Sequence, residues 1–137
     1  MYQIYLSVTW KNSKHKDKLY KLLENSKKKG ISFSIFGESG QPEFSSISLS
    51  KKHSIGEEMK NAKVILFPEG AYVDNKEAID SEMNFAADFG IVKIVVSEEL
   101  NNRKDYELYE NETDINCSFE DESFWGAIDE GCFIFPI

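Results

Sequence analysis

One carboxylate, Glu82, falls at a position where a charged side chain is unexpected. The segment from Asp74 to Gly90 has the periodicity of an amphipathic helix. At about 100° per residue, Glu82 lies near the middle of the apolar stripe. The rest of that stripe consists of Ala78, Ile79, Met83, Phe85, Ala86 and Phe89. A carboxylate there is costly unless it is paired, protonated or open to a cleft. Either Glu82 caps a backbone group or pairs with a lysine, or it is a cleft carboxylate used for chemistry.

A single cleft carboxylate suits glycosyl-transfer chemistry at a ribose carbon. It can stabilise an oxocarbenium-like centre, hydrogen-bond to ribose hydroxyls or attack as a nucleophile. The hydroxyls of Ser7 and Thr9 and the rings of Trp10 and Tyr72 are candidate substrate contacts. Either ring could stack on a flat base, and the alternative for Trp10 is that it plugs the edge of the sheet.

Other familiar site patterns are missing from the sequence. The glycine-rich segment 37–40 lacks the lysine of a phosphate-binding loop, and there is no Gly-x-Gly-x-x-Gly or Gly-x-Ser-x-Gly motif. His15 and His53 stand in polar stretches and are expected at the surface. Cys117 and Cys132 are expected to be free thiols. We therefore predict no metal site and no bound cofactor.

Apolar runs alternate with segments of helical periodicity along the chain. We expect strands over residues 2–9, 31–36, 63–67 and 91–96, and helices over residues 14–28, 54–61, 74–90 and 120–130. A long loop is expected over 37–52, segment 97–116 has no clear pattern, and the apolar tail 132–137 is expected to pack back on the domain. The alternation predicts an α/β, flavodoxin-like parallel sheet flanked by helices, with strand order 2-1-3-4 and room for a fifth strand.

Ligands in such sheets bind beyond the carboxyl ends of the strands, where the strand order reverses. Those ends are predicted at residues 7–10, 37–39 and 68–72, which places Gly37 among the substrate-binding candidates. The helix that carries Glu82 follows the third of these segments. The topology therefore brings Glu82 toward the cleft, independently of its position on the helix.

Composition narrows the function classes. The 137 residues suit a single domain over 1–137, and 41% hydrophobic residues allow a real core. The net charge of −8 disfavours a binder of nucleic-acid backbones. The sequence has no apolar run of transmembrane length and no signal-peptide pattern at its start. We expect a cytoplasmic protein with no nucleic-acid or membrane partner.

Several segments together resemble TIR domains. Residues 5–9 (Tyr-Leu-Ser-Val-Thr), with Asp17 downstream, resemble the first box, and 63–67 (Lys-Val-Ile-Leu-Phe) resemble the central strand. Segment 81–86, followed by Gly90 and an apolar strand, is similar to the catalytic helix and the strand after it. Phe124-Trp125 resembles the third box. The resemblance covers nearly the whole chain and is nearest to the short bacterial TIR-like proteins, including those of Thoeris anti-phage defence.

The resemblance implies that Glu82 cleaves the nicotinamide–ribose bond of NAD, which is a substrate and not a cofactor. The product would be ADP-ribose, a cyclic form or a conjugate that signals to an effector protein. A homo-oligomer is compatible with this interpretation. The loop over 37–52 would cover the substrate. The chain departs from the family in having Glu77-Ala78 where a tryptophan often precedes the glutamate, and Gly40-Gln41-Pro42 in the loop.

Two alternatives fit the same residues. Nucleoside deoxyribosyltransferases share this kind of sheet and use a helix glutamate as the ribosyl nucleophile, with Asp74 and Asp80 as imperfect matches to their aspartate motif. The other alternative is a non-enzymatic interaction module that assembles through TIR-like surfaces. Turnover of NAD separates the first interpretation from the module, and nucleobase exchange identifies the transferase.

Overall fold

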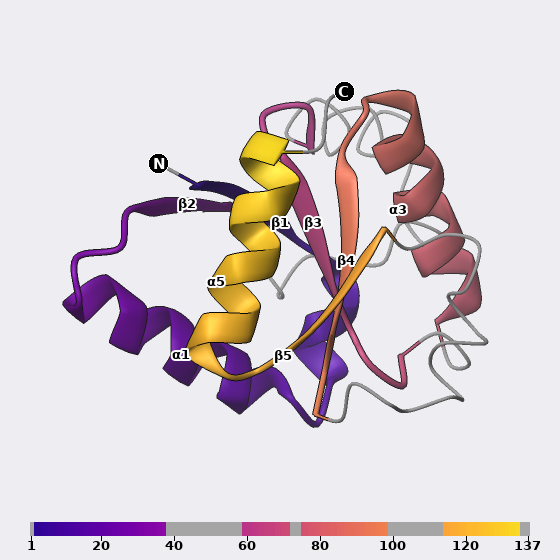
Figure 1. Ribbon diagram of the computed structural model, residues 1–137. Helices are drawn as coiled ribbons and strands as arrows, with labels where there is room; N and C mark the ends of the chain where they lie inside the picture. The colour runs from indigo at the N-terminus through magenta and orange to yellow at the C-terminus, as the bar shows by residue number, and fades with distance from the viewer. Residues whose placement is uncertain (1, 38–58, 72–74, 99–113, 135–137) are drawn as a thin grey trace.

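Five parallel strands form one sheet in the computed structural model, which describes residues 2–37, 59–71, 75–98 and 114–134 (Figure 1). The strands are β1 (Tyr2–Leu6), β2 (Phe33–Phe36), β3 (Val64–Pro68), β4 (Val92–Ser97) and β5 (Ile115–Ser118). Their order is β2-β1-β3-β4-β5, and each neighbouring pair is parallel. This confirms the predicted α/β, flavodoxin-like fold and adds a fifth strand at the edge.

Helices cover both faces of the sheet. They are α1 (Lys16–Lys28), α3 (Lys76–Asp88) and α5 (Asp121–Asp129), with a short 3₁₀ helix η1 (Val8–Asn12) after β1 and a π-helical turn η3 (Glu130–Ile134) after α5. One core cluster joins α1 and α5 to one face of the sheet, and a second joins α3 to the other. Figure 1 shows the same division, with α3 apart from α1 and α5.

Strand alternation builds these two cores. In β1, Ile4 and Leu6 point to the α1–α5 side, whereas Tyr5 between them points to the α3 side. In β3, Leu66 and Phe67 divide between the faces in the same way. All five residues of β3 are buried, as expected for a central parallel strand with a nearly continuous apolar sequence.

The first strand is shorter than predicted. It ends at Leu6, and the residues from Val8 onward form η1. The Ser7 hydroxyl accepts a hydrogen bond from the backbone N–H of Thr9 at 3.2 Å, which starts the turn. The prediction of strand over 2–9 is therefore wrong at its end, because a serine that can cap a turn outweighs the β-branched residues after it.

The predicted ends of the helices over 14–28 and 74–90 lie within two residues of the ends of α1 and α3. Gly30, at φ +88°, follows α1 in the left-handed conformation that commonly ends a helix. At the start of α3 the capping position is Asn75, whose side chain makes no capping hydrogen bond to the helix. Asp74, the first residue of the helix predicted over 74–90, lies outside the described residues. So do the loop after Gly37, most of the predicted helix over 54–61, and 99–113 within the unassigned segment.

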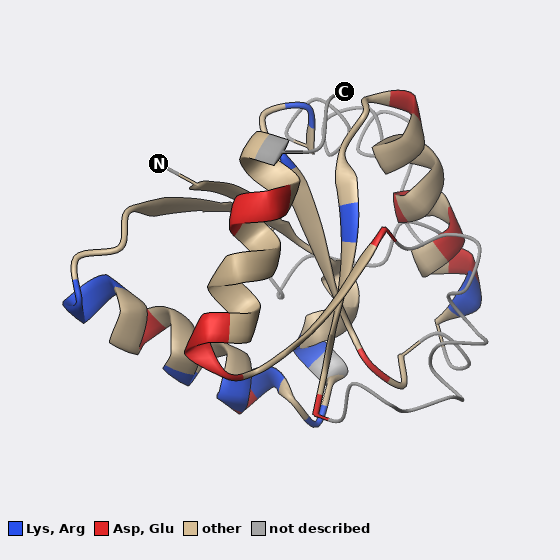
Figure 2. Ribbon diagram, in the orientation of Figure 1, with Lys and Arg blue, Asp and Glu red and all other residues tan. Residues whose placement is uncertain are grey.

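Charge is distributed unevenly over the elements. Figure 2 shows lysines concentrated along α1 and acidic residues along α3 and α5. Within the described residues, no helix is both long and apolar enough to cross a membrane. In the apolar tail predicted over 132–137, Cys132 contacts the core and Phe133 is 64% exposed, and residues 135–137 lie outside the described part of the chain.

Candidate functional site

The Glu82 carboxylate is enclosed at the carboxyl end of β1. Its exposed fraction is 0%, so the predicted position in the apolar stripe of α3 is confirmed. The Ser7 hydroxyl lies 2.5 Å from Oε1 and donates to it, and the backbone N–H of Val8 donates to Oε2 at 3.0 Å. Hydrogen bonds to a charged group contribute about 1.5–3 kcal/mol each. Glu82 therefore ties α3 to the start of η1, across 75 positions of sequence.

A short chain of hydroxyls leads from this carboxylate to a cavity. The Ser7 and Thr9 side-chain oxygens lie 2.7 Å apart, and Thr9 lines the cavity. Ser7 is fully buried and Thr9 is nearly so. The structure thus brings together three of the predicted site residues, Glu82, Ser7 and Thr9, with Thr9 nearest to solvent.

The cavity lies at the switch point between β1 and β3. Its volume is about 350 Å³, at the lower end of the range for small-molecule sites, about 300–1,000 Å³. Its lining is mostly polar and consists of Thr9, Ser13, Lys14, Glu69, Gly70, Ala71 and Asn75. The Asn75 amide donates to the Ala71 carbonyl at 2.9 Å, which holds this rim in place. This is the position that the fold class predicts for a ligand.

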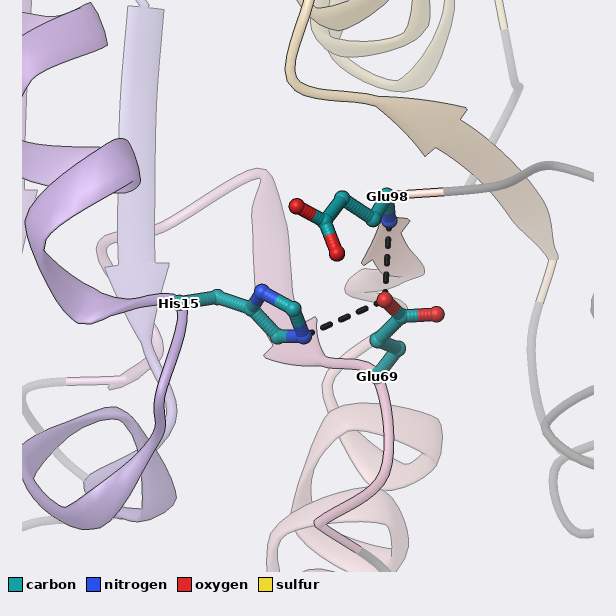
Figure 3. Close-up of side chains that lie close together, drawn as sticks. All are labelled: His15, Glu69 and Glu98. Atoms are coloured by element: carbon teal, nitrogen blue, oxygen red, sulfur yellow. Dashed lines mark hydrogen bonds and ion pairs between the residues drawn. The ribbon is translucent and has the colours of Figure 1, made fainter.

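A histidine and two glutamates meet beside the cavity (Figure 3). His15 precedes α1, Glu69 follows β3 and Glu98 follows β4. His15 Nε2 lies 3.1 Å from Glu69 Oε1, and the backbone N–H of Glu98 donates to the same oxygen at 3.0 Å. Each of the three side chains has one possible metal-ligand atom that lies within 4.8 Å of those of the other two.

His15 is buried, with 2% of its surface exposed, so its predicted surface position is wrong. The polar neighbours Ser13, Lys14 and Lys16 gave no sign of this. The ring is covered by residues distant in sequence, with its centroid 5.5 Å from that of Phe119. Burial lowers the pKa of the His15 imidazole below 6.5; the Glu69 carboxylate raises it in part, and Lys14 lowers it further. The imidazole is therefore neutral at pH 7.

Trp10 belongs to the core in this structure. It is fully buried, its indole N–H donates to the Leu66 carbonyl at 2.8 Å, and its ring meets Phe119 edge to face. The position corresponds to the packing alternative for Trp10, and the described conformation exposes no ring face to a ligand. Tyr72, the other stacking candidate, lies outside the described residues.

Gly37 has a clear structural reason to be glycine. Its φ is +66°, and a Cβ atom there would lie 2.4 Å from the Tyr5 ring. The residue lets the chain leave β2 directly against β1. Its predicted contact with substrate stays a prediction, because the loop that follows lies outside the described residues.

Sequence reasoning missed Glu69 and Glu98 as neighbours of the cleft. Each comes directly after a buried parallel strand, in the register where Pro68 pairs with Val96. An acidic residue directly after each of two adjacent parallel strands was the signal that could have found them. His15 carried no comparable signal.

Comparisons with known proteins bear on the fold. No protein-family model matches the chain, and no curated protein matches it in sequence. Among solved structures, the chain is similar to a protein of Burkholderia pseudomallei proposed to be related to pilus assembly. The TM-score is 0.61 at 8% identity, over 96% of this chain and 90% of that one. Similarity at that identity supports the fold and carries no function to this chain.

Proposed function

We propose that this protein cleaves the nicotinamide–ribose bond of NAD at the carboxyl edge of its sheet. The observation that carries the proposal is the position of Glu82. Its carboxylate comes from the helix after β3 and reaches the end of β1, where hydroxyls connect it to the switch-point cavity. The resemblance to TIR domains assigns the reaction to the same glutamate.

The chemistry follows from charge. As the bond to nicotinamide breaks, positive charge develops on the ribose ring. A carboxylate in a site from which water is excluded stabilises that charge more than water does. The Ser7 hydroxyl and the Val8 N–H would orient Glu82 and limit its motion.

Access to the carboxylate requires a local rearrangement in this proposal. Ser7 stands between Glu82 and Thr9, and Glu82 has no exposed surface. Substrate must displace the Ser7 hydroxyl from Oε1, or η1 must shift away from α3. We accordingly assign the described conformation to a resting state, and we expect turnover to increase on activation or assembly. The product would then act on an effector protein.

The test is incubation of the purified chain with NAD, alone and with lysate of infected cells, followed by mass spectrometry. Release of nicotinamide supports the proposal, and the accompanying mass distinguishes ADP-ribose, a cyclic form and a conjugate. A parallel incubation with a deoxynucleoside and a free base tests the transferase alternative. Nucleobase exchange without nicotinamide release would replace the proposal with that alternative.

One observation favours a second candidate, a non-enzymatic interaction module. Both Glu82 oxygens are engaged in holding Ser7 and Val8 at the start of η1, which is a sufficient structural reason for a buried glutamate. Absence of nicotinamide release under every activating condition, including assembly with partners, would favour this candidate.

A further inference from the structure

A second site lies at the edge of the cavity. It shares Glu69 with the cavity lining and uses none of the residues assigned to the cleavage of NAD. His15, Glu69 and Glu98 come from three separate segments that converge at the carboxyl ends of β3 and β4 (Figure 3). We propose that His15, Glu69 and Glu98 bind one divalent transition-metal ion, with Zn²⁺ preferred.

The spacing of the donor atoms fits a single ion. Two ligands of one zinc ion, each at about 2.1 Å, lie roughly 3.0–3.4 Å apart. The separation of His15 Nε2 from Glu69 Oε1 is 3.1 Å. A Glu98 oxygen lies within 4.8 Å of one donor atom of each of the other two side chains, so rotation of this half-exposed side chain can complete the set. Three protein ligands leave a coordination position for water.

The unsatisfied histidine nitrogen is the second observation. His15 Nε2 is buried and has no hydrogen-bond partner among the described residues, although it lies close to Glu69 Oε1. The two atoms are near each other but are not aligned for a hydrogen bond. In the neutral tautomer that carries its hydrogen on Nδ1, Nε2 is an acceptor facing a carboxylate that also only accepts. A cation bound there would satisfy Nε2 and would be a further partner for Glu69 Oε1, which already accepts from the Glu98 N–H.

The surroundings hold the donors in place before an ion arrives. The Phe119 ring packs against the imidazole, and the His15 backbone N–H donates to the Ser13 hydroxyl at 3.0 Å. Glu69 is anchored by its own N–H, which donates to the Val96 carbonyl at 3.1 Å.

Lys18 is the competing cation at this site. Its ammonium forms an ion pair with Glu98 Oε1, and both side chains are about half exposed. Exposed ion pairs contribute little to stability, so Lys18 can leave for solvent when a doubly charged ion binds. A ligand set of one imidazole and two carboxylates favours Zn²⁺ over Mg²⁺ and Ca²⁺, which prefer oxygen ligands alone.

The test uses the full chain, freed of metal with EDTA and then dialysed. Titration with ZnCl₂ by isothermal calorimetry should give one ion per chain, and excess Mg²⁺ should not displace it. Loss of residues that merely orient metal ligands weakens binding by roughly 10–100-fold. His15→Asn and Glu69→Gln, which remove direct ligands, should weaken it at least that much. Glu24→Gln, an exposed acid on α1 that pairs with Lys28, should bind as the parent does.

Folding of the buried variants is checked in EDTA by urea denaturation. If His15→Asn or Glu69→Gln fails to fold, Glu98→Gln serves instead, because that side chain is half exposed. Cobalt provides a second readout, since Co²⁺ bound by the histidine should give a visible spectrum that His15→Asn loses. No saturable Zn²⁺ binding, or equal affinity in the parent and the folded variants, would overturn the proposal. Either result leaves the NAD experiment unaffected.

Discussion

Single side chains at the strand edge combine structural and chemical demands. Glu82 illustrates this, because the contacts that make its burial tolerable also place it next to the candidate cavity. Unpaired, a buried carboxylate would cost several kcal/mol. The Ser7 hydroxyl and the Val8 N–H offset that cost. The same pair of donors would hold a catalytic carboxylate in one orientation.

His15 gives a pH dependence with a definite sign. Its folded pKa lies below 6.5, chiefly because of burial, so the unfolded chain takes up a proton first as the pH falls. The contribution of His15 to stability is fully present above the pKa of the unfolded chain, about 6.5. This contribution is lost as the pH falls from about 6.5 toward the pKa of the folded chain. The slope for one group is at most about 1.4 kcal/mol per pH unit. The groups that face it are Glu69, Lys14, Lys18 and Glu98.

The measurement is the urea midpoint at pH 7.5, 6.5 and 5.5 in EDTA, for the wild type and His15→Gln. We expect the wild type to lose more stability than the variant over this range. His53 is present in both chains, so its contribution cancels. Parallel pH profiles would contradict the assignment of a buried, neutral His15.

The burial of single residues could be predicted from the sequence where local periodicity determines it. Burial could not be predicted where tertiary packing determines it. Glu82 was placed on the apolar stripe by its helical spacing, and it is buried there. The burial of His15 depends on Phe119 and Glu69, which belong to distant segments. No local pattern reports such a contact.

At the end of β2, the backbone passes so close to the Tyr5 ring that only glycine fits at position 37. Gly37→Ala would force an alanine into the left-handed region and bring its Cβ against the Tyr5 ring, which is 1% exposed. We expect a loss of about 2–4 kcal/mol from backbone strain and overpacking together. Urea unfolding followed by circular dichroism measures it.

The matched control is Gly126→Ala in α5. Gly126 is exposed, and a Cβ there would meet no atom within 4 Å. This change should stabilise the chain by up to about 1 kcal/mol, because alanine favours the helix. A neutral Gly37→Ala would show that β2 leaves the sheet differently from the described path.

The elements themselves were predicted best where periodicity is long. The segments 14–28 and 74–90 contain α1 and α3, each of 13 residues. Strand β5 has only four residues, Ile115–Ser118, of which Asn116 is exposed. A run so short and so polar has no recognisable strand pattern, and it becomes a strand by pairing with β4. The turn at Ser7 was missed for the opposite reason, since Val8 and Thr9 favour strand locally.

At the scale of the whole molecule, the core on the α1–α5 side of the sheet buries a thiol whose reactivity can measure global unfolding. Burial raises the pKa of Cys117, in β5, to about 12. At pH 8 almost none of this thiol is ionised, and the thiolate is the reactive form. We expect a Cys132→Ser variant to react with a thiol reagent only slowly in native buffer. Its rate should rise with urea in parallel with unfolding.

The complementary variant, Cys117→Ser, reports on Cys132. That thiol is only partly buried, and its pKa is raised mainly by burial. In the Cys132→Ser variant, labelling of Cys117 under native conditions at the rate of an exposed thiol would contradict the packing of β5 at the sheet edge.

The measurement that tests the central claim most directly is nicotinamide release by the wild type, Glu82→Gln and Glu77→Gln under activating conditions. Glu82→Gln keeps the shape of the side chain but removes the charge that would stabilise the ribose cation. We expect its rate to fall roughly 10²–10³-fold, by analogy with the loss of one oxyanion-hole donor. Glu77 is exposed in the first turn of α3, so Glu77→Gln should retain nearly the full rate. Equal rates for the wild type and a folded Glu82→Gln would contradict the role assigned to Glu82.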